Sequence, residues 1–293
     1  MTKLLITGAS GELGRILSIL AIRQHHVIGT YLSNSTIGAG LPLQLDLRDR
    51  DATLQTVESH KPDVIIHTAC SDRSNDMERT IVLAGAHIAE AASCNNARLI
   101  VLSTDMVFDG ENPPYREDSP PAPLSPYGRA KSEMEQSIRE ITPGGLIVRT
   151  SLIYEFSMRS RQVSWMRDAL KAGNTLTLFV DEIRQPVWGP NLAAAILELA
   201  HNDLSGILNV AGPNAMSRSA YGRMLFEVMN LGPSTLVREV TSNQVSPNRP
   251  RDLSLDLTNA RTMLSTRLLS IHEALRFHLA LHQGHPTSTT TRR

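Results

Sequence analysis

Residues 3–14 of the chain read Lys3-Leu4-Leu5-Ile6-Thr7-Gly8-Ala9-Ser10-Gly11-Glu12-Leu13-Gly14. The apolar run at the start of this segment predicts a short buried strand, and the glycines that follow mark a tight turn. A helical spacing of apolar residues comes next, and then a second apolar run, Val27-Ile28-Gly29-Thr30-Tyr31. Strand, glycine turn, helix and strand within about 30 residues form a dinucleotide-binding unit.

Each of the three glycines has a physical role in such a unit. Gly8 permits the tight turn, Gly11 lets backbone N–H groups approach a pyrophosphate, and Gly14 lets the helix pack closely on the strand. The diphosphate is expected at the N-terminus of this helix, where free N–H groups and the helix dipole favour negative charge. The cofactor contacts predicted in this segment are Gly8, Ser10, Gly11, Glu12, Leu13 and Gly14.

Strand-like and helix-like patterns continue to alternate through the first half of the chain. Strands are expected at residues 43–45, 64–69, 99–102 and 146–148, and helices at 51–59, at 76–92 and from 127 to just before 143. This alternation predicts an α/β fold with a doubly wound parallel (Rossmann) sheet. Ligands of such sheets bind at the carboxyl ends of the strands. The predicted strand ends carry Thr7, Tyr31, Asp46, Ala69 and Thr104.

The alternation loosens beyond about Tyr154. Helices are expected at 158–172, 191–201 and 219–229, and strands at 176–180 and 209–212. We expect residues 1–154 to form an NAD(P)-binding Rossmann domain. Residues 155–283 are expected to form a smaller C-terminal substrate-binding domain, with some of its elements returning to the sheet. Residues 284–293 are polar and low in complexity, which predicts a disordered tail.

The composition is that of an ordinary globular protein. The chain has 293 residues, of which 41% are hydrophobic, and its 29 Lys and Arg residues balance 29 Asp and Glu residues. This balance gives no reason to expect nucleic acid or an anionic membrane as a partner. No apolar run approaches 18 residues and no leader segment is recognisable, so a cytoplasmic protein is expected. Cys70 and Cys94 have no metal-ligand spacing, no metal site is predicted, and Cys70 is expected to be a small buried thiol.

Tyr127 and Lys131 form the most suggestive pair of polar residues. They are four residues apart on a predicted helix, so their side chains lie on the same face, about one turn apart. An ammonium group beside a phenol favours the phenolate, which makes Tyr127 a candidate proton donor or acceptor near neutral pH. Thr104, at the end of a predicted strand, is placed to hydrogen-bond the same reacting oxygen.

The glycine spacing, taken with Thr104, Tyr127 and Lys131, resembles the extended branch of the short-chain dehydrogenase/reductase superfamily. Within that branch the chain is similar to dTDP-4-dehydrorhamnose reductases over roughly residues 1–275. The likeness rests on Leu102-Ser103-Thr104-Asp105-Met106-Val107-Phe108-Asp109-Gly110, Pro114-Tyr115-Arg116-Glu117, Pro123-Leu124-Ser125-Pro126-Tyr127-Gly128, Arg149-Thr150-Ser151 and Arg249-Pro250-Arg251-Asp252-Leu253-Ser254.

This resemblance implies a role for each member of the proposed triad. Tyr127 would be the general acid that protonates the oxygen of a carbonyl reduced by hydride from a nicotinamide. Lys131 would lower the pKa of Tyr127 and hydrogen-bond the nicotinamide ribose, and Thr104 would orient the carbonyl. Asp105 would either share in the proton chemistry or cap the turn that follows it.

Cofactor preference depends on the end of the second predicted strand. NAD binding usually uses an acidic residue there, whereas this chain has Thr30-Tyr31-Leu32-Ser33-Asn34. NADP(H) is therefore favoured and NAD(H) is left open, with Ser33, Asn34 or Arg15 as candidates to bind a 2′-phosphate. Asp46 and Leu47 resemble the adenine-contacting pair of the family. The predicted cofactor contacts beyond the glycine segment are Tyr31, Ser33, Asp46, Leu47, Ala69 and Lys131.

Two positions depart from the pattern of dTDP-4-dehydrorhamnose reductases. Met106 stands where the family commonly has Tyr, and Leu152 stands where it commonly has Trp. Aromatic rings supply contact area and orientation to a substrate, so these changes indicate an altered substrate wall. The candidate substrate contacts are Asp105, Met106, Leu152, Arg184 and Arg249, and Trp188 is a weaker one.

The leading interpretation is an NAD(P)H-dependent carbonyl reductase that acts on a nucleotide-linked 4-keto-6-deoxy sugar. A reductase of a different ketone in secondary metabolism is one alternative, favoured by Met106 and Leu152. The other alternative is an NADP-binding regulatory subunit, because the regulatory subunit of methionine adenosyltransferase resembles the same reductases. Both enzyme hypotheses predict a small-molecule substrate. The sequence is also compatible with a homodimer.

Overall fold

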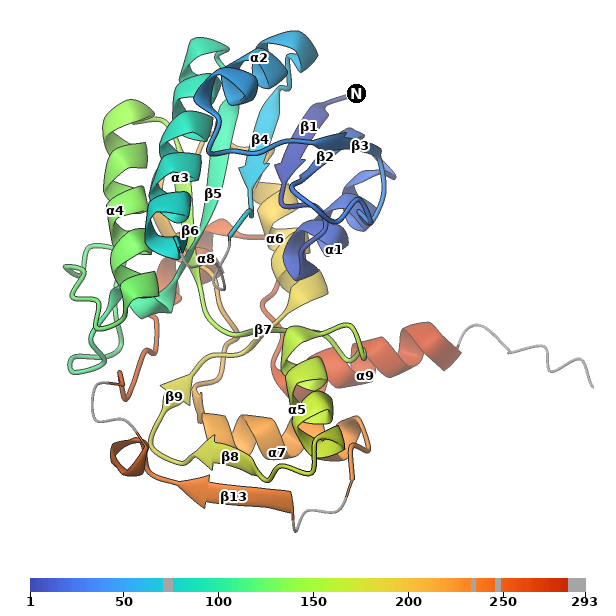
Figure 1. Ribbon diagram of the computed structural model, residues 1–293, viewed down its shortest axis with the longest axis vertical. Helices are drawn as coiled ribbons and strands as arrows, with labels where there is room; N and C mark the ends of the chain where they lie inside the picture. The colour runs from blue at the N-terminus through green and yellow to red at the C-terminus, as the bar shows by residue number, and fades with distance from the viewer. Residues whose placement is uncertain (71–75, 233–235, 246–248, 284–293) are drawn as a thin grey trace, which may run out of the picture.

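A seven-stranded parallel sheet forms the centre of the protein (Figure 1). The computed structural model describes residues 1–70, 76–232, 236–245 and 249–283. The strand order across the sheet is β11-β6-β5-β4-β1-β2-β3, and every neighbouring pair runs parallel. The strands are β1 (Lys3–Thr7), β2 (His26–Tyr31), β3 (Leu41–Gln44), β4 (Val64–His67), β5 (Arg98–Thr104), β6 (Leu146–Thr150) and β11 (Gly206–Asn209).

Helices cover both faces of this sheet. They do so because the strands present apolar side chains to both faces. In β1, Leu4 and Ile6 pack into the core on one face, and Leu5 packs into the core on the other. On the first face lie α1 (Glu12–Ala21), α6 (Gly189–Leu199) and α8 (Thr258–Met263). On the second face lie α2 (Arg50–His60), α3 (Met77–Cys94) and α4 (Pro126–Ile141). Strands buried on both sides explain the continuous apolar runs of the sequence.

A second group of elements lies at the carboxyl-end edge of the sheet and has its own apolar core, which includes Tyr154, Trp188 and Tyr221. Small two-stranded pairs join β7 to β10, β9 to β12 and β8 to β13. The strands of this group are β7 (Ile153–Tyr154), β8 (Leu176–Phe179), β9 (Ile183–Arg184), β10 (Val187–Trp188), β12 (Met216–Ser217) and β13 (Val237–Val240). Its helices are α5 (Arg161–Lys171), α7 (Arg218–Val228) and α9 (Ile271–Gln283). Short 3-10 turns at η1 (Asp105–Val107) and η3 (Ser242–Gln244) complete the described elements.

The predicted α/β fold with a doubly wound parallel sheet is confirmed. Several boundaries differ by a few residues, because strand ends carry little periodic signal. The strand expected at 64–69 ends at His67, and the strand expected at 209–212 is β11, which ends at Asn209. The division near residue 154 stays a prediction, although α6 and β11, which follow it in sequence, belong to the sheet layers. The tail predicted at 284–293 lies outside the described residues.

Candidate active site and cofactor cleft

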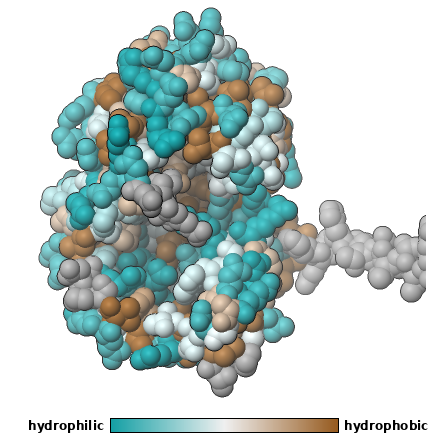
Figure 2. Space-filling model, in the orientation of Figure 1, coloured by the Kyte–Doolittle hydropathy of each residue, from teal (hydrophilic) through white to brown (hydrophobic). Residues whose placement is uncertain are grey.

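Two cavities meet along the carboxyl ends of the sheet strands. The larger has a volume of about 610 Å³ and lies between the sheet and the second group of elements. The smaller, of about 220 Å³, lies beyond the ends of β1, β2 and β4. Gly11, Thr68 and Cys70 line both cavities, so the two form one cleft. Figure 2 shows the surface hollowed between the upper and lower parts of the molecule.

The glycine segment fits the diphosphate of a dinucleotide. Gly8 has a φ of +69°, a conformation that favours glycine, and a Cβ built on Gly14 would lie 2.3 Å from the backbone oxygen of Gly8. The N-cap residue of α1 is Gly11, and no side chain among the described residues caps the helix there. Backbone N–H groups therefore face the cleft at the positive end of the helix dipole, which is the arrangement that binds phosphate.

The smaller cavity has the residues expected for the adenosine part of the cofactor. Of the predicted contacts, its lining includes Gly8, Ser10, Gly11, Tyr31, Asp46, Leu47 and Ala69. Ser33 is exposed and is absent from the described lining of both cavities. Arg48, which the sequence reasoning missed, also lines this cavity and pairs with Asp46, with Nη2 2.6 Å from Oδ2. The sequence feature that could have identified Arg48 is its position two residues after the predicted contact Asp46.

Two further expectations at the cofactor end need correction or qualification. Cys70 is exposed in the cleft and is not the small buried thiol that was expected, because it follows the end of β4 and lies outside the packed sheet. Arg15 is held by an ion pair to Glu155, with Nη2 2.5 Å from Oε1. One turn earlier on α1, Glu12 Oε2 accepts a hydrogen bond from the backbone N–H of Arg161 at 3.2 Å. Both contacts direct side chains of α1 toward the second group of elements and not toward the smaller cavity.

The proposed catalytic residues meet in the larger cavity. Thr104 ends β5, and Tyr127 and Lys131 lie one turn apart near the start of α4. Pro126 and the N-cap Ser125 begin this helix, and Ser125 Oγ accepts from the backbone N–H of Gly128 at 3.0 Å. The cap fixes the residue at which the helix starts, and so it fixes the position of Tyr127 relative to the carboxyl ends of the strands.

Lys131 is only 3% exposed and its ammonium is anchored on the sheet. Its Nζ donates a hydrogen bond to the backbone oxygen of Leu102 at 2.9 Å. Burial lowers the pKa of Lys131, while nearby Cys70 and Glu135 oppose that shift. The side chain therefore has a fixed position beside Tyr127, which suits a group that acts on its neighbour through charge.

His67 is a buried neighbour of Lys131 that the sequence reasoning missed. It ends β4, is 1% exposed, and its Nδ1 lies 2.8 Å from Thr7 Oγ1. Burial, followed by the charge of Lys131, lowers the pKa of His67 to about 3. The imidazole near the proposed catalytic lysine is therefore neutral at neutral pH. In the sequence, a histidine closing an apolar strand was the available signal.

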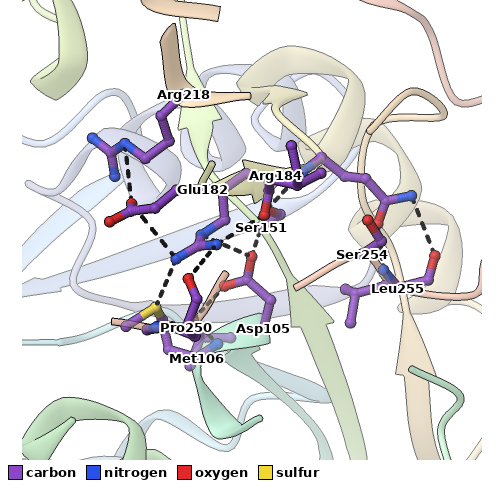
Figure 3. Close-up of polar contacts among 12 residues, drawn as sticks. Asp105, Met106, Ser151, Glu182, Arg184, Arg218, Pro250, Ser254 and Leu255 are labelled. Atoms are coloured by element: carbon purple, nitrogen blue, oxygen red, sulfur yellow. Dashed lines mark hydrogen bonds and ion pairs between the residues drawn. The ribbon is translucent and has the colours of Figure 1, made fainter. Parts of the chain in front are cut away.

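Asp105 is the centre of a buried polar cluster that includes Ser151 and Arg184 (Figure 3). Its Oδ2 accepts a hydrogen bond from Ser151 Oγ at 2.6 Å, and its Oδ1 accepts one from Thr104 Oγ1 at 3.2 Å. Arg184 Nε lies 4.0 Å from Oδ2. Burial raises the pKa of Asp105, opposed first by the charge of Arg184 and then by the bonds from Ser151 and Thr104. Thr104 Oγ1 also accepts from the backbone N–H of Met106, so it caps η1.

Three arginines surround one buried carboxylate in the wall of the larger cavity. Glu182 is fully buried; Arg249 donates to it, Arg218 Nε lies 3.9 Å from it and Arg184 Nη2 lies 4.0 Å from it. Figure 3 shows Arg184 and Arg218 on opposite sides of Glu182. All three arginines line the cavity, as do the predicted Asp105, Met106 and Leu152. Glu182 and Arg218 were missed, because nothing in the sequence relates them to the distant Arg249.

Trp188 lies elsewhere. It is 5% exposed and packs in the core of the second group of elements, with its ring 5.8 Å from that of Phe277.

Within the described residues, no group of three or more His, Cys, Asp or Glu side chains is arranged to hold a metal ion. Nor is any described helix long and apolar enough to cross a membrane.

The sequence model of the family described as "RmlD substrate binding domain" matches residues 1–283. The chain belongs to this family. The match spans the glycine segment, the proposed triad and the arginine-lined wall, and the predicted resemblance to dTDP-4-dehydrorhamnose reductases of the extended short-chain type is confirmed.

The relatives of this RmlD-family chain include reductases and a subunit of methionine adenosyltransferase. It is 32% identical over 271 residues to the "Probable low-salt glycan biosynthesis reductase Agl14" of Haloferax volcanii, covering 87% of this chain and 89% of that one. It is 30% identical over 270 residues to methionine adenosyltransferase 2 subunit beta of Xenopus tropicalis, covering 86% and 79%. Among solved structures, the dTDP-4-dehydrorhamnose reductase of Bacillus anthracis in complex with NADP superposes with a TM-score of 0.79 at 26% identity, covering 95% of this chain and 98% of that one.

Proposed function

We propose that this protein is an NADPH-preferring carbonyl reductase that acts on a nucleotide-linked 4-keto-6-deoxy sugar. One observation carries the proposal: a single cavity holds the glycine segment, the Thr104, Tyr127 and Lys131 set, and the arginines around Glu182. A phosphate-binding turn beside a proton donor suits hydride chemistry, and arginines at the other side suit an anionic substrate. The names of the Haloferax and Bacillus relatives agree with this chemistry.

The cofactor, when bound, supplies the hydride, and the residues of this chain manage the oxygen and its proton. Tyr127 would donate a proton to the oxygen of the reduced carbonyl, a step worth roughly 10²–10⁴-fold in rate for a well-placed acid. The ammonium of Lys131 would stabilise the resulting phenolate through its positive charge. Because Lys131 is anchored to Leu102 O, it needs no rearrangement when the charge on Tyr127 changes.

The arginines give the cavity an excess of positive charge. Arg184, Arg218 and Arg249 contribute three cations, while Glu182 and Asp105 are the carboxylates that face them. Arg218 and Arg249 are the more accessible of the three, with 23% and 37% of their side chains exposed. We propose that these two bind the diphosphate of the substrate, since guanidinium groups form paired hydrogen bonds with phosphate.

The cofactor preference follows from the adenosine cavity. The residues after β2 include no carboxylate to repel a 2′-phosphate, and Arg48 lines the same cavity. NADP(H) is therefore favoured. NAD(H) is also compatible with the cavity, because the charge of Arg48 is already balanced by its ion pair with Asp46. We further propose that residues 1–154 and 155–283 act as the cofactor-binding and substrate-binding parts. A cytoplasmic location and a homodimer stay predictions.

The test is NADPH oxidation by the purified protein in the presence of dTDP-4-keto-6-deoxyglucose. Tyr127→Phe should lower kcat by roughly 10²–10⁴-fold while calorimetric binding of NADPH is retained. Glu133→Gln, an exposed change on the same helix, is the matched control and should keep full turnover. Equal kcat for wild type and Tyr127→Phe would show that another group is the acid.

A second candidate function is a cofactor-binding regulatory subunit, and the Xenopus relative is the observation that favours it. The two functions differ in one measurement. Tight NADPH binding without turnover of any sugar-nucleotide ketone, together with co-purification of a methionine adenosyltransferase, would favour the subunit. Turnover that depends on Tyr127 would favour the reductase.

A further inference from the structure

Glu12 joins the starts of two helices. It is the first residue of α1, directly after the N-cap Gly11, and it lines the larger cavity. Its side chain reaches α5, where Oε2 accepts a hydrogen bond at 3.2 Å from the backbone N–H of Arg161, the first residue of that helix. The buried Ser160, which is the N-cap residue of α5, hydrogen-bonds the same carboxyl group. Glu12 thus begins α1 with its backbone and caps α5 with its side chain.

The surroundings of this carboxyl group make its negative charge costly. Its Oε1 is buried, and none of the described residues donates a hydrogen bond to it. Burial raises the pKa of Glu12, and the charge of Glu155 adds to that shift. The hydrogen bonds from Arg161 and Ser160 oppose the shift without cancelling it.

The other titratable groups near Glu12 leave this balance in place. On α1, Arg15 is paired with Glu155, with Nη2 2.5 Å from Oε1, so these two charges oppose each other. On α7, Tyr221 is buried, and burial raises the pKa of its phenol well above the usual value, so it is neutral. On α5, the charge of Arg161 favours the ionised form of Glu12. A further negative charge in this place would favour the acid form.

A dinucleotide supplies that negative charge. Its diphosphate is expected at the start of α1, where the N–H groups that follow Gly11 face the cleft. Glu12 is the next residue, so its carboxyl group and the diphosphate share this end of the helix. Two like charges in one place disfavour each other, and the diphosphate stays ionised at neutral pH. Glu12 is therefore the group that can become neutral.

We propose that Glu12 takes up a proton when a dinucleotide binds and keeps its contact with the start of α5 in the neutral form. A protonated carboxyl group still has an oxygen that accepts from the N–H of Arg161, and its new O–H can donate. The diphosphate then binds without a repelling charge beside it, and α5, whose Arg161 and Gln162 line the cavity, stays attached. This inference rests on the proposed function because it requires a nicotinamide dinucleotide at the glycine segment.

The proposal fixes the sign of a pH dependence. The pKa of Glu12 is higher in the complex than in the free protein, so the complex binds more protons between these two values. Dinucleotide affinity should therefore rise as pH falls through the pKa of the complex and level off below the pKa of the free protein. The rise is at most about tenfold per pH unit, because one proton is involved.

The test is calorimetry of NADPH binding in buffers of different ionisation enthalpy, which measures the protons taken up per cofactor. Wild type should take up a fraction of a proton that Glu12→Gln does not, and the NADPH affinity of the variant should depend less on pH. The amide of the variant keeps an oxygen that accepts from Arg161, so α5 stays capped. Asp51→Asn removes an exposed carboxylate from the first turn of α2 and is the matched control, which should take up protons like wild type.

Two other ligands separate the diphosphate from the rest of the cofactor. NADH lacks the 2′-phosphate and should show the same difference in proton uptake between wild type and Glu12→Gln. Adenosine 2′-monophosphate lacks the diphosphate and should show no difference between the two proteins. Protons exchanged by the 2′-phosphate itself cancel in this comparison, because both proteins bind the same ligand.

Equal proton uptake by wild type and Glu12→Gln would overturn the proposal and leave the cofactor assignment intact. A difference with adenosine 2′-monophosphate would also contradict it, because the diphosphate would not be the cause. If neither dinucleotide bound, the proposed function would fail together with this inference. Should Glu12→Gln not fold, Ser160→Ala tests the same group, since loss of this donor raises the pKa of Glu12 and should move the proton uptake to higher pH. An unmoved profile in Ser160→Ala would count against the proposal.

Discussion

Arg149 and Glu135 form a buried ion pair directly behind the proposed active site. Arg149 Nη2 lies 2.7 Å from Glu135 Oε2, Arg149 Nε lies 3.1 Å from Oε1, and both side chains are at most 3% exposed. Ser103, next to Thr104 on β5, donates to the same carboxylate at 2.5 Å. The pair thus joins β6, α4 and β5 at the point where the proposed triad is held.

Breaking this pair should be costly. We expect Arg149→Leu to lower the free energy of unfolding by about 3–5 kcal/mol, because an uncompensated carboxylate stays buried. Arg50→Leu, which removes an exposed pair with Glu90, is the control and should cost less than about 1 kcal/mol. Urea denaturation followed by circular dichroism measures both. The double change Glu135→Leu with Arg149→Leu should cost less than the sum of the two single changes, and additivity would argue against the pairing.

His67 should make the protein sensitive to acid. Its pKa is about 3 in the folded protein, against about 6.5 when unfolded, so between these values the unfolded chain binds a proton that the folded protein does not. Stability therefore falls as pH falls below about 6.5, with a slope that approaches about 1.4 kcal/mol per pH unit from this group. His67→Gln should show a shallower loss between pH 6 and pH 4 in urea titrations. The same slope in both proteins would mean that another group is responsible.

Gly14 should be essential for cofactor binding. A Cβ at this position would lie 2.3 Å from Gly8 O, so Gly14→Ala must displace either the turn or the start of α1. We expect NADPH affinity to fall at least tenfold in calorimetry, since the phosphate contacts depend on this geometry. Gly144→Ala, where a Cβ meets no atom within 4 Å, is the control and should bind NADPH like wild type. If Gly14→Ala bound NADPH with wild-type affinity, the diphosphate of the cofactor would have to bind at another place.

Arg218 should act on substrate and not on cofactor. Arg218→Met removes a cation from the larger cavity, and we expect KM for a nucleotide sugar to rise about ten- to a hundredfold, the range of a charge-assisted hydrogen bond. NADPH affinity should not change. Arg223→Met, on the same helix but in an exposed pair with Glu239, should leave KM unaltered. If both variants behaved alike, general charge and not a specific contact would explain the effect.

The sequence predicted the sheet because the sheet depends on local patterns, and the cofactor contacts stay predictions that were made in the same way. The glycine spacing, the apolar runs and the Tyr127 and Lys131 spacing are all readable within a few turns of chain. The arginine-lined wall was only partly predicted, since Glu182, Arg218 and Arg249 come from segments far apart in sequence and gain their meaning from one shared contact. His67 was missed for the same reason, because its charged neighbour Lys131 lies on the distant α4. Arg48 was missed although its partner Asp46 is only two residues away. The expected burial of Cys70 was wrong because strand periodicity does not say where the packed sheet ends.

The return of β11 to the sheet has a consequence for how the protein is made. β6 is buried along its whole length and pairs in parallel with β11, while α6 packs on α1, so the nucleotide-binding layers include chain from both sides of residue 154. A fragment that ends at residue 154 would expose β6 as an unpaired edge. During synthesis, that edge stays open until residue 209 has left the ribosome. The nascent chain therefore carries β6 as an open edge of the sheet until β11 is available to pair with it.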